Sequence, residues 1–421
     1  MLVLRRHIRH TAPVTPPAQR VRYRDVLGVG EFRGLLVSDG LSGVGDQVAR
    51  IAVALLVLER SGSAFAASAT YACSYLSWLV GGPLLSALPD RYPRRRLMVA
   101  CDLARMALVA ALAVPGAPLW VVFSVLITVG LLAPPAEAAR SALLADVLHG
   151  EQYVVGSALN NAVGQAAQVV GFVLGGALVA LVGVGGALLV DAGTFALSAF
   201  LLLALVREHL VARVPGPPQS AMQEAVAGAR LVWGSPRLRT LLAWGLLAAA
   251  AVIAPEGLAV AIAEQQGGGP LAAGLLTASA PLGFLLGSFA LLRVPTARRE
   301  ALFPGMVALT CVPLLATPFV NSIPVIVGLW VVAGLGNAMQ LVANAAFVQE
   351  VPPHLRGRAF GVAATLLMVL QGLVLLGAGA LAEVTEPRVP IAVLALVSLL
   401  VMPLLSPSAQ GAAMLGRRAA G

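Results

Sequence analysis

The chain has 421 residues, of which 59% are hydrophobic and only 11% are charged, and its mean hydropathy is +0.89. Because soluble domains carry about 25% charged residues, this composition argues against a water-soluble enzyme, and it excludes a disordered or collagen-like chain. The net charge is +9 and all 28 basic residues are arginines that lie between apolar runs, which indicates membrane topology rather than nucleic-acid binding.

Apolar runs follow one another along the chain after a polar N-terminal segment. Residues 1–32 hold arginines and a proline cluster without the apolar core of a cleaved signal peptide, so we expect a flexible cytoplasmic tail. A helix that crosses a bilayer needs about 20 apolar residues. The runs therefore predict an all-α membrane protein with twelve transmembrane helices, over 34–58, 64–88, 97–114, 118–138, 157–182, 186–206, 238–262, 271–292, 301–320, 323–348, 359–382 and 389–406.

The longest internal polar stretch, residues 207–237, divides the apolar region into two bundles of six spans, 33–206 and 238–406, and a cytoplasmic tail, 407–421, follows. A six-plus-six arrangement is typical of a duplicated transporter whose halves rock about a central site. Within the polar linker, Met222 to Trp233 has the pattern of a short amphipathic helix on the membrane surface.

The arginines fix the expected orientation. With the N-terminus inside, 24 of the 28 fall in the tails, in the cytoplasmic loops or at the cytoplasmic helix ends, whereas Arg60 and Arg388 fall outside. Only Arg50 and Arg105 fall within spans. This bias predicts a multi-pass protein of the cytoplasmic membrane with both termini in the cytoplasm.

The loop between the second and third spans carries Asp90, Arg91, Arg94 and Arg95. It resembles the loop signature of the major facilitator superfamily, Gly-x-x-x-Asp-Arg-x-Gly-Arg-Arg, with a serine and a proline at the two glycine positions. An acidic residue there can face the positive N-terminus of a helix in the other half, so we expect a cytoplasmic charge clamp. The simpler interpretation is an ordinary positive-inside loop.

Four further stretches resemble one branch of that superfamily, the enterobactin- and macrolide-efflux exporters: Leu41–Gln47, Ala139–Asp146, Asp191–Phe195 and Leu355–Arg358. The resemblance spans nearly the whole chain. It implies a secondary transporter that exports a small apolar or amphipathic compound, such as a drug, a siderophore or a secondary metabolite, in exchange for protons. The alternative is an importer or facilitator of a small metabolite on the same fold.

The fifth span carries Gly171, Gly175 and Gly176, which resemble the antiporter signature Gly-Pro-x-x-Gly-Gly with Phe172 in place of the proline. Glycines at this spacing allow close helix packing. The missing proline removes the expected kink, so packing of small residues is the alternative to an antiporter function.

Charges within the spans are candidate functional groups, because a charge at the bilayer centre costs about 2.5–3.5 kcal/mol unless it faces a cavity or a partner. Asp46 and Arg50 share one face of the first span: Asp46 is either a carboxylate that binds protons or substrate, or one partner of an i,i+4 ion pair. Asp39 is expected to anchor the inner rim. Glu256, after Pro255 in the equivalent seventh span, either shares the cavity with Asp46 or lies in its outer mouth.

Further polar residues fall within or at the ends of the spans. Asp191 is expected at the start of its helix, in the outer half of the membrane. Amides of the fifth and tenth spans either line the substrate path or bond between helices: Gln165, Asn337, Gln340 and Asn344. Four charges near the inner ends are expected to belong to the gate: Asp102, Arg105, Glu137 and Arg140.

Other chemistry has no signature in this sequence. There is no phosphate-binding loop, zinc motif or nucleophile elbow, and Cys73, Cys101 and Cys311 are scattered in apolar runs. We therefore expect no enzymatic activity, no cofactor and no metal. The expected state is a monomer whose partners are lipid, a small-molecule substrate and protons.

Overall fold

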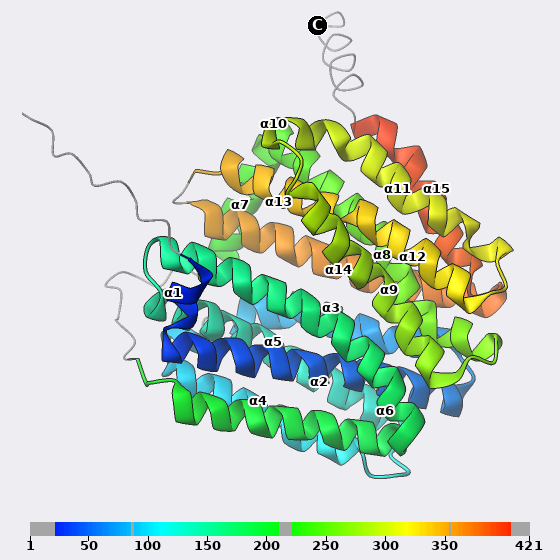
Figure 1. Cartoon of the computed structure of the whole chain (residues 1–421), viewed down its shortest axis with the longest axis horizontal. Coiled ribbons are helices and arrows are strands. Elements are labelled where there is room, and N and C mark those ends of the chain that lie inside the picture. The colour runs from blue at the N-terminus through cyan, green and yellow to red at the C-terminus, as the bar shows by residue number, and fades with distance from the viewer. Residues whose placement is uncertain (1–21, 86–87, 210–220, 353–354, 406–421) are drawn as a thin grey trace, which may run out of the picture.

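The computed structural model describes residues 22–85, 88–209, 221–352 and 355–405, and throughout these ranges the regular elements are helices (Figure 1). The first part of the chain forms α1 (Tyr23–Leu27), α2 (Gly30–Ser61), α3 (Ala64–Leu85), η1 (Leu88–Asp90), α4 (Arg94–Leu112), α5 (Leu119–Val147) and α6 (Glu151–Leu205).

The second part of the chain begins with α7 (Ala221–Gly234), α8 (Pro236–Gln265) and α9 (Gly269–Leu291). It continues with α10 (Thr296–Arg299), η2 (Glu300–Leu302), α11 (Phe303–Ala316), η3 (Thr317–Phe319), α12 (Ile323–Asn337), α13 (Met339–Glu350), α14 (Arg356–Val384), α15 (Val389–Val401) and η5 (Met402–Leu405).

Helices lie at all twelve predicted spans, and eight of them are long and apolar enough to cross a membrane. One of the eight, α6, has 55 residues and leaves the helical conformation at Gly183, where φ is 72° and ψ is 175°. Glycine adopts this φ without a steric penalty. The fifth and sixth predicted spans are therefore two arms of α6, whereas α3, α4 and α15 coincide with predicted spans but do not belong to that set of eight.

The helices gather in two halves. In Figure 1, α2, α4 and α6 lie in the lower part of the molecule, and α11, α12 and α15 lie in the upper part. One end of the bundle carries the basic segment from Arg91 to Arg96, and we call it the arginine-rich end; the other, with Gly62, Gly183 and Arg388, is the opposite end. The largest apolar cluster joins the halves, since it contains Trp330 of the second and Phe172 of the first.

Two helices extend further at the arginine-rich end than the hydropathy predicts. The span predicted to end at 138 continues as α5 to Val147, and the one predicted to start at 157 begins at Glu151. Hydropathy misses these turns because they carry polar residues. The Arg94 guanidinium pairs with Asp146 in the last turn of α5, which stabilises that extension.

The linker between the halves is partly docked on the first half. Arg95 donates to the carbonyl oxygen of Val206 at 2.9 Å, and Arg96 pairs with Glu208 at 2.8 Å. The helix predicted from Met222 to Trp233 is present as α7. It packs against α14, because a Cβ at Gly228 would collide with the backbone there.

Arg60 and Arg388, the two arginines outside the expected cytoplasmic segments and spans, each donate to a backbone carbonyl at the opposite end. Arg60 donates to the oxygen of Ala117 at 2.5 Å. Arg388 is only 7% exposed and donates to the oxygen of Val320 at 2.8 Å and to Asn321 Oδ1 at 2.5 Å. Each arginine therefore ties two connecting segments together, which explains its place there.

Replacement of Gly175 by valine should destabilise the first half. A Cβ at Gly175 would lie 3.0 Å from Val48 Cα on α2, so the two helices would have to separate. Overpacking of this kind costs about 1–3 kcal/mol. The thermal midpoint in detergent should fall for Gly175→Val and stay near the wild-type value for Gly164→Val, since no atom lies within 4 Å of a Cβ at Gly164 on the same helix. Equal midpoints for the two variants would contradict this packing.

Candidate functional site

The two halves are in contact at the opposite end. Glu383, in the last turn of α14, accepts hydrogen bonds from the Ser63 hydroxyl at 2.7 Å and the Phe65 backbone N–H at 2.8 Å. A carboxylate at the N-terminus of α3 satisfies free backbone donors and interacts favourably with the helix dipole. One turn further, Ser68 donates to the carbonyl oxygen of Leu375 at 2.8 Å.

A pair of glycines on two other helices also brings the halves together. Gly176 on α6 faces Gly274 on α9, and a Cβ at Gly176 would lie 3.0 Å from the Gly274 Cα and would collide with the Pro270 carbonyl. Small residues let helices approach to backbone contact. Gly171 and Gly175 have the same role between α6 and α2, so the predicted packing function of this glycine motif is present at two interfaces.

The halves are separated by a cavity at the arginine-rich end. Its volume is about 660 Å³. Both halves line it, α5 and α6 on one side and α13 and α14 on the other, with Glu137, Ser141, Leu144, Tyr153, Ser157, Asn160, Asn161, Phe347, Val348, Val351, Arg356, Gly357 and Phe360. The described structure is thus closed at one end and hollow at the other.

One ion pair joins the halves in the middle of the spans. Arg50 Nη1 on α2 lies 3.3 Å from Glu256 Oε1 on α8, and the side chains are only 27% and 12% exposed. The Tyr75 hydroxyl of α3 lies 3.5 Å from the same carboxylate oxygen, and its ring lies 5.6 Å from the guanidinium carbon. Arg50 therefore pairs across the halves, and among the described residues it forms no ion pair with Asp46 on its own helix.

Amide side chains surround Glu256 in a cavity between the halves. Three of the amide groups predicted from the sequence line this cavity, namely Gln165, Asn337 and Gln340, and Gln168 of α6 and Gln371 of α14 join them. The Asn337 Oδ1 and Gln371 Oε1 atoms are buried without a hydrogen-bond partner. A buried polar atom without a partner is costly, so these oxygens suit a bound polar group.

Asn344 does not belong to this set. It lies on the tenth predicted span with Asn337 and Gln340, but it is not among the residues that line this cavity, and it is exposed. Gln371 and Tyr75 were not identified from the sequence. In the sequence, each is marked only by being a single polar group inside an apolar run.

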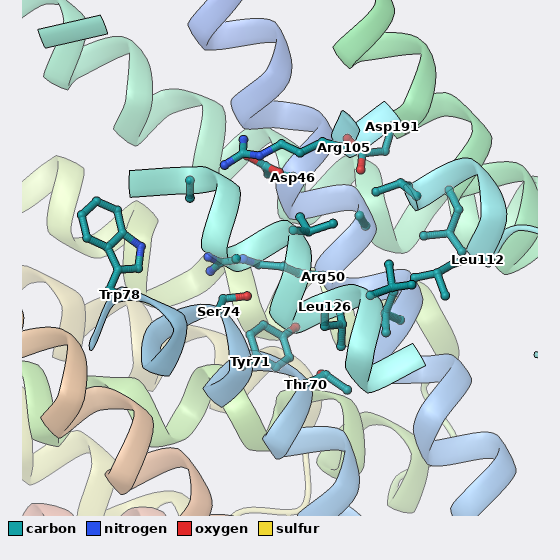
Figure 2. A pocket seen from close by; sticks show the side chains of 18 residues that line it. Asp46, Arg50, Thr70, Tyr71, Ser74, Trp78, Arg105, Leu112, Leu126 and Asp191 are labelled. Atoms are coloured by element: carbon teal, nitrogen blue, oxygen red, sulfur yellow. The ribbon is translucent and has the colours of Figure 1, made fainter. Parts of the chain in front are cut away.

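A second polar cavity lies within the first half (Figure 2). Asp46, Arg50, Arg105 and Asp191 line it together with Tyr71, Ser74 and Trp78 of α3. The prediction that Asp191 sits at the start of its helix is wrong. The second arm of α6 starts after Gly183, so Asp191 lies about two turns inside it, and its side chain is 0% exposed.

The remaining inner charges form contacts within the first half. Arg140 pairs with Asp39 at 2.5 Å and with Glu137 at 2.8 Å. Asp102 accepts a hydrogen bond from Ser198 at 2.7 Å. Among the described residues, no group of three His, Cys, Asp or Glu side chains is placed to hold a metal ion.

The loop signature is not engaged with the second half in this conformation. Within the described part of the chain, Asp90 and Arg91 are exposed and form no ion pair. Arg94 pairs with Asp146 and Arg95 binds the end of α6, so both hold the first half together. This fits an open arginine-rich end, and the cross-half clamp stays a prediction.

Comparison with known proteins identifies the family to which this fold belongs. The family model of the Major Facilitator Superfamily matches residues 35–291 and 257–411, which is most of the chain. The chain belongs to the major facilitator superfamily. Solved members share its fold: a nucleoside transporter NupG mutant superposes with a TM-score of 0.69 at 14% identity over 89% of this chain and 98% of that one. A bacterial homologue of the lysosomal transporter Spinster, inward-facing and occupied, superposes with a TM-score of 0.69 at 15% identity over 91% and 96% of the two chains.

Sequence relatives within the superfamily include drug pumps. The multidrug efflux pump Tap of Mycolicibacterium fortuitum is 28% identical over 359 residues, 81% of this chain and 87% of that protein. Tap of Mycobacterium tuberculosis strain H37Rv is 28% identical over 371 residues, 83% and 86% of the two chains. An uncharacterised transporter of this superfamily, YfiS of Bacillus subtilis strain 168, is 29% identical over 264 residues, 60% and 61% of the two chains.

Because Arg50 and Glu256 form an ion pair between the halves, the effects of Arg50→Gln and Glu256→Gln on the free energy of unfolding should be strongly coupled. Each single substitution leaves one charge without its partner in a poorly solvated place, whereas the double substitution removes both charges. A double-mutant cycle on the free energy of unfolding in mixed micelles should give a coupling of about 0.5–3 kcal/mol. Tyr75→Phe, which keeps the pair, is the control. Additive single effects would contradict a direct contact.

Proposed function

We propose that this transporter exports small amphipathic compounds across the cell membrane in exchange for protons. The observation that carries the proposal is the Arg50–Glu256 pair, a charge contact that crosses the halves beside a cavity with unpaired buried amide oxygens. A contact of this kind is sensitive both to protons and to a polar ligand. The likeness to Tap, a multidrug efflux pump by name, favours export of drug-like molecules.

The mechanism we infer is alternating access. The Glu383 cap and the Gly176–Gly274 contact close the opposite end, while the 660 Å³ cavity opens the arginine-rich end. We propose that the arginine-rich end faces the cytoplasm, that both termini are cytoplasmic, and that the chain crosses the membrane twelve times. The rocking bodies are then 33–206 and 238–406, joined by the linker 207–237, and one monomer suffices for transport.

Transport by inside-out membrane vesicles tests the exchange. Respiration acidifies the lumen, so an exporter that exchanges substrate for protons should accumulate ethidium inside and should speed proton loss when the dye is added. Both signals are measured by fluorescence, and both should disappear with a protonophore. Vesicles from cells without the transporter are the control.

Other outcomes separate the alternatives. Dye movement that follows only its own gradient and ignores the protonophore would indicate a facilitator. Accumulation in right-side-out vesicles energised in the natural direction would indicate an importer. Either result would overturn the proposed proton-coupled export.

Orientation can be tested with Arg60→Cys in a background without Cys73, Cys101 and Cys311. Arg60 is exposed at the opposite end, so an impermeant thiol reagent should label the variant in intact cells. The matched control is Arg293→Cys, which is exposed after α9 at the arginine-rich end and should react only after permeabilisation. The reverse labelling pattern would invert the proposed topology.

A further inference from the structure

The cavity in the first half holds two carboxylates from two different helices. Asp46 of α2 and Asp191 of α6 both line it, and Figure 2 shows them on the same side of the cavity as Arg105. Their helices touch at Gly45, where a Cβ would collide with Asp191 Oδ1 and with the Thr194 hydroxyl. The glycine next to Asp46 thus brings the two carboxylates to one cavity.

Few hydrogen-bond donors compensate for the burial of the Asp191 carboxylate. Its side chain is 0% exposed and its Oδ2 atom has no hydrogen-bond partner. The Thr194 hydroxyl lies 3.2 Å from Oδ1 but closer, 2.8 Å, to the Asp191 carbonyl oxygen. An ionised carboxylate with so few donors is expensive in a membrane-spanning segment, whereas a protonated one is not.

The charged groups that face Asp46 and Asp191 supply one positive charge too few to balance both carboxylates. Arg105 on α4 is 8% exposed, lies over the Phe195 ring at 5.6 Å, and is in no ion pair among the described residues. Arg50 is already paired with Glu256. Among the described residues that line the cavity, α3 contributes one titratable group, Tyr71, and α5 contributes apolar side chains and a glycine.

The neighbouring turns do not supply the missing charge. Asp102, one turn from Arg105, is held by Ser198, and Arg140 is held by Asp39 and Glu137. Once the Arg50 charge is assigned to Glu256, the cavity keeps two carboxylates, Asp46 and Asp191, and one guanidinium, Arg105, a net charge of −1 that one bound proton neutralises. Like charges in a poorly solvated site cannot both ionise without a large cost.

We propose that Asp46 and Asp191 together bind the proton that this transporter exchanges, with Arg105 balancing the carboxylate that stays ionised. The proposal rests on the proton-coupled function above and names the site for it. When the proton leaves, the cavity becomes negative and attracts Arg50, which lines this cavity and also reaches Glu256 in the second half. Loss of the proton thereby weakens the contact between the halves.

Infrared difference spectra of the purified protein, recorded between acid and alkaline buffer, test the site without any substrate. The wild type should show the band of a protonated carboxyl group that titrates. Asp191→Asn and Asp46→Asn should each lose that band, and Asp191→Glu should keep a shifted band. The control is Glu300→Gln, because the Glu300 carboxylate pairs with Arg237 outside the cavity. This variant should keep the wild-type band. An unchanged band in Asp191→Asn would overturn the proposal, and because Asp191→Glu keeps a carboxyl group, it reports even where the asparagine variant fails to fold.

Vesicle assays separate this proposal from the proposed function. Asp191→Asn should lose ethidium accumulation driven by the proton gradient but keep exchange of dye for dye, which needs no net proton movement. Wild-type vesicles without proton-driven export would contradict the function. Proton-driven export in the wild type that survives in Asp191→Asn would contradict only the site.

Discussion

The cost of placing charge in lipid is the constraint on which the structure depends. Every ionised group within the spans needs a partner or a cavity, and the Arg50–Glu256 pair meets this need with one residue from each half. An ion pair within one half would stabilise that half alone. A pair that crosses the halves makes their relative position part of the charge balance, and in the proposed mechanism it links protonation, ligand binding and the arrangement of the two bundles.

The same constraint explains where the other charged residues lie and what they contact. Near the arginine-rich end they pair within the first half, as Arg140 does with Asp39, and so hold the helices of that half together. At the opposite end Arg388 pairs with Glu386 and donates to the carbonyl oxygen of Val320, and Glu383 caps α3. Within the described residues, the cavity of the first half brings together two carboxylates, Asp46 and Asp191, and one guanidinium, Arg105, that is in no ion pair. In the proposed mechanism, this cavity is the unbalanced site between the paired charges at the two ends.

Hydropathy was sufficient to predict where the helices lie, because lipid imposes a length and a polarity on each span. It could not predict the partner of Arg50, since its ion pair joins residues 206 positions apart. The depth of Asp191 was mistaken because the second arm of α6 starts directly after Gly183, before the predicted start at 186, and because the sequence does not show that the Asp191 side chain is buried. The sequence also could not show that Asn344 lies outside the cavity around Glu256, because that depends on how the helices pack.

Distances between spin labels at the two ends test the central claim most directly. One pair of labels joins the halves at the arginine-rich end, Ala145→Cys with Gln349→Cys, and another joins them at the opposite end, Leu181→Cys with Phe319→Cys; all four positions are exposed. Between acid and alkaline pH in proteoliposomes, one distance should lengthen as the other shortens, and Glu256→Gln should change the balance. Two distances that stay constant, or that change in the same direction, would contradict halves that rock about the Arg50–Glu256 contact.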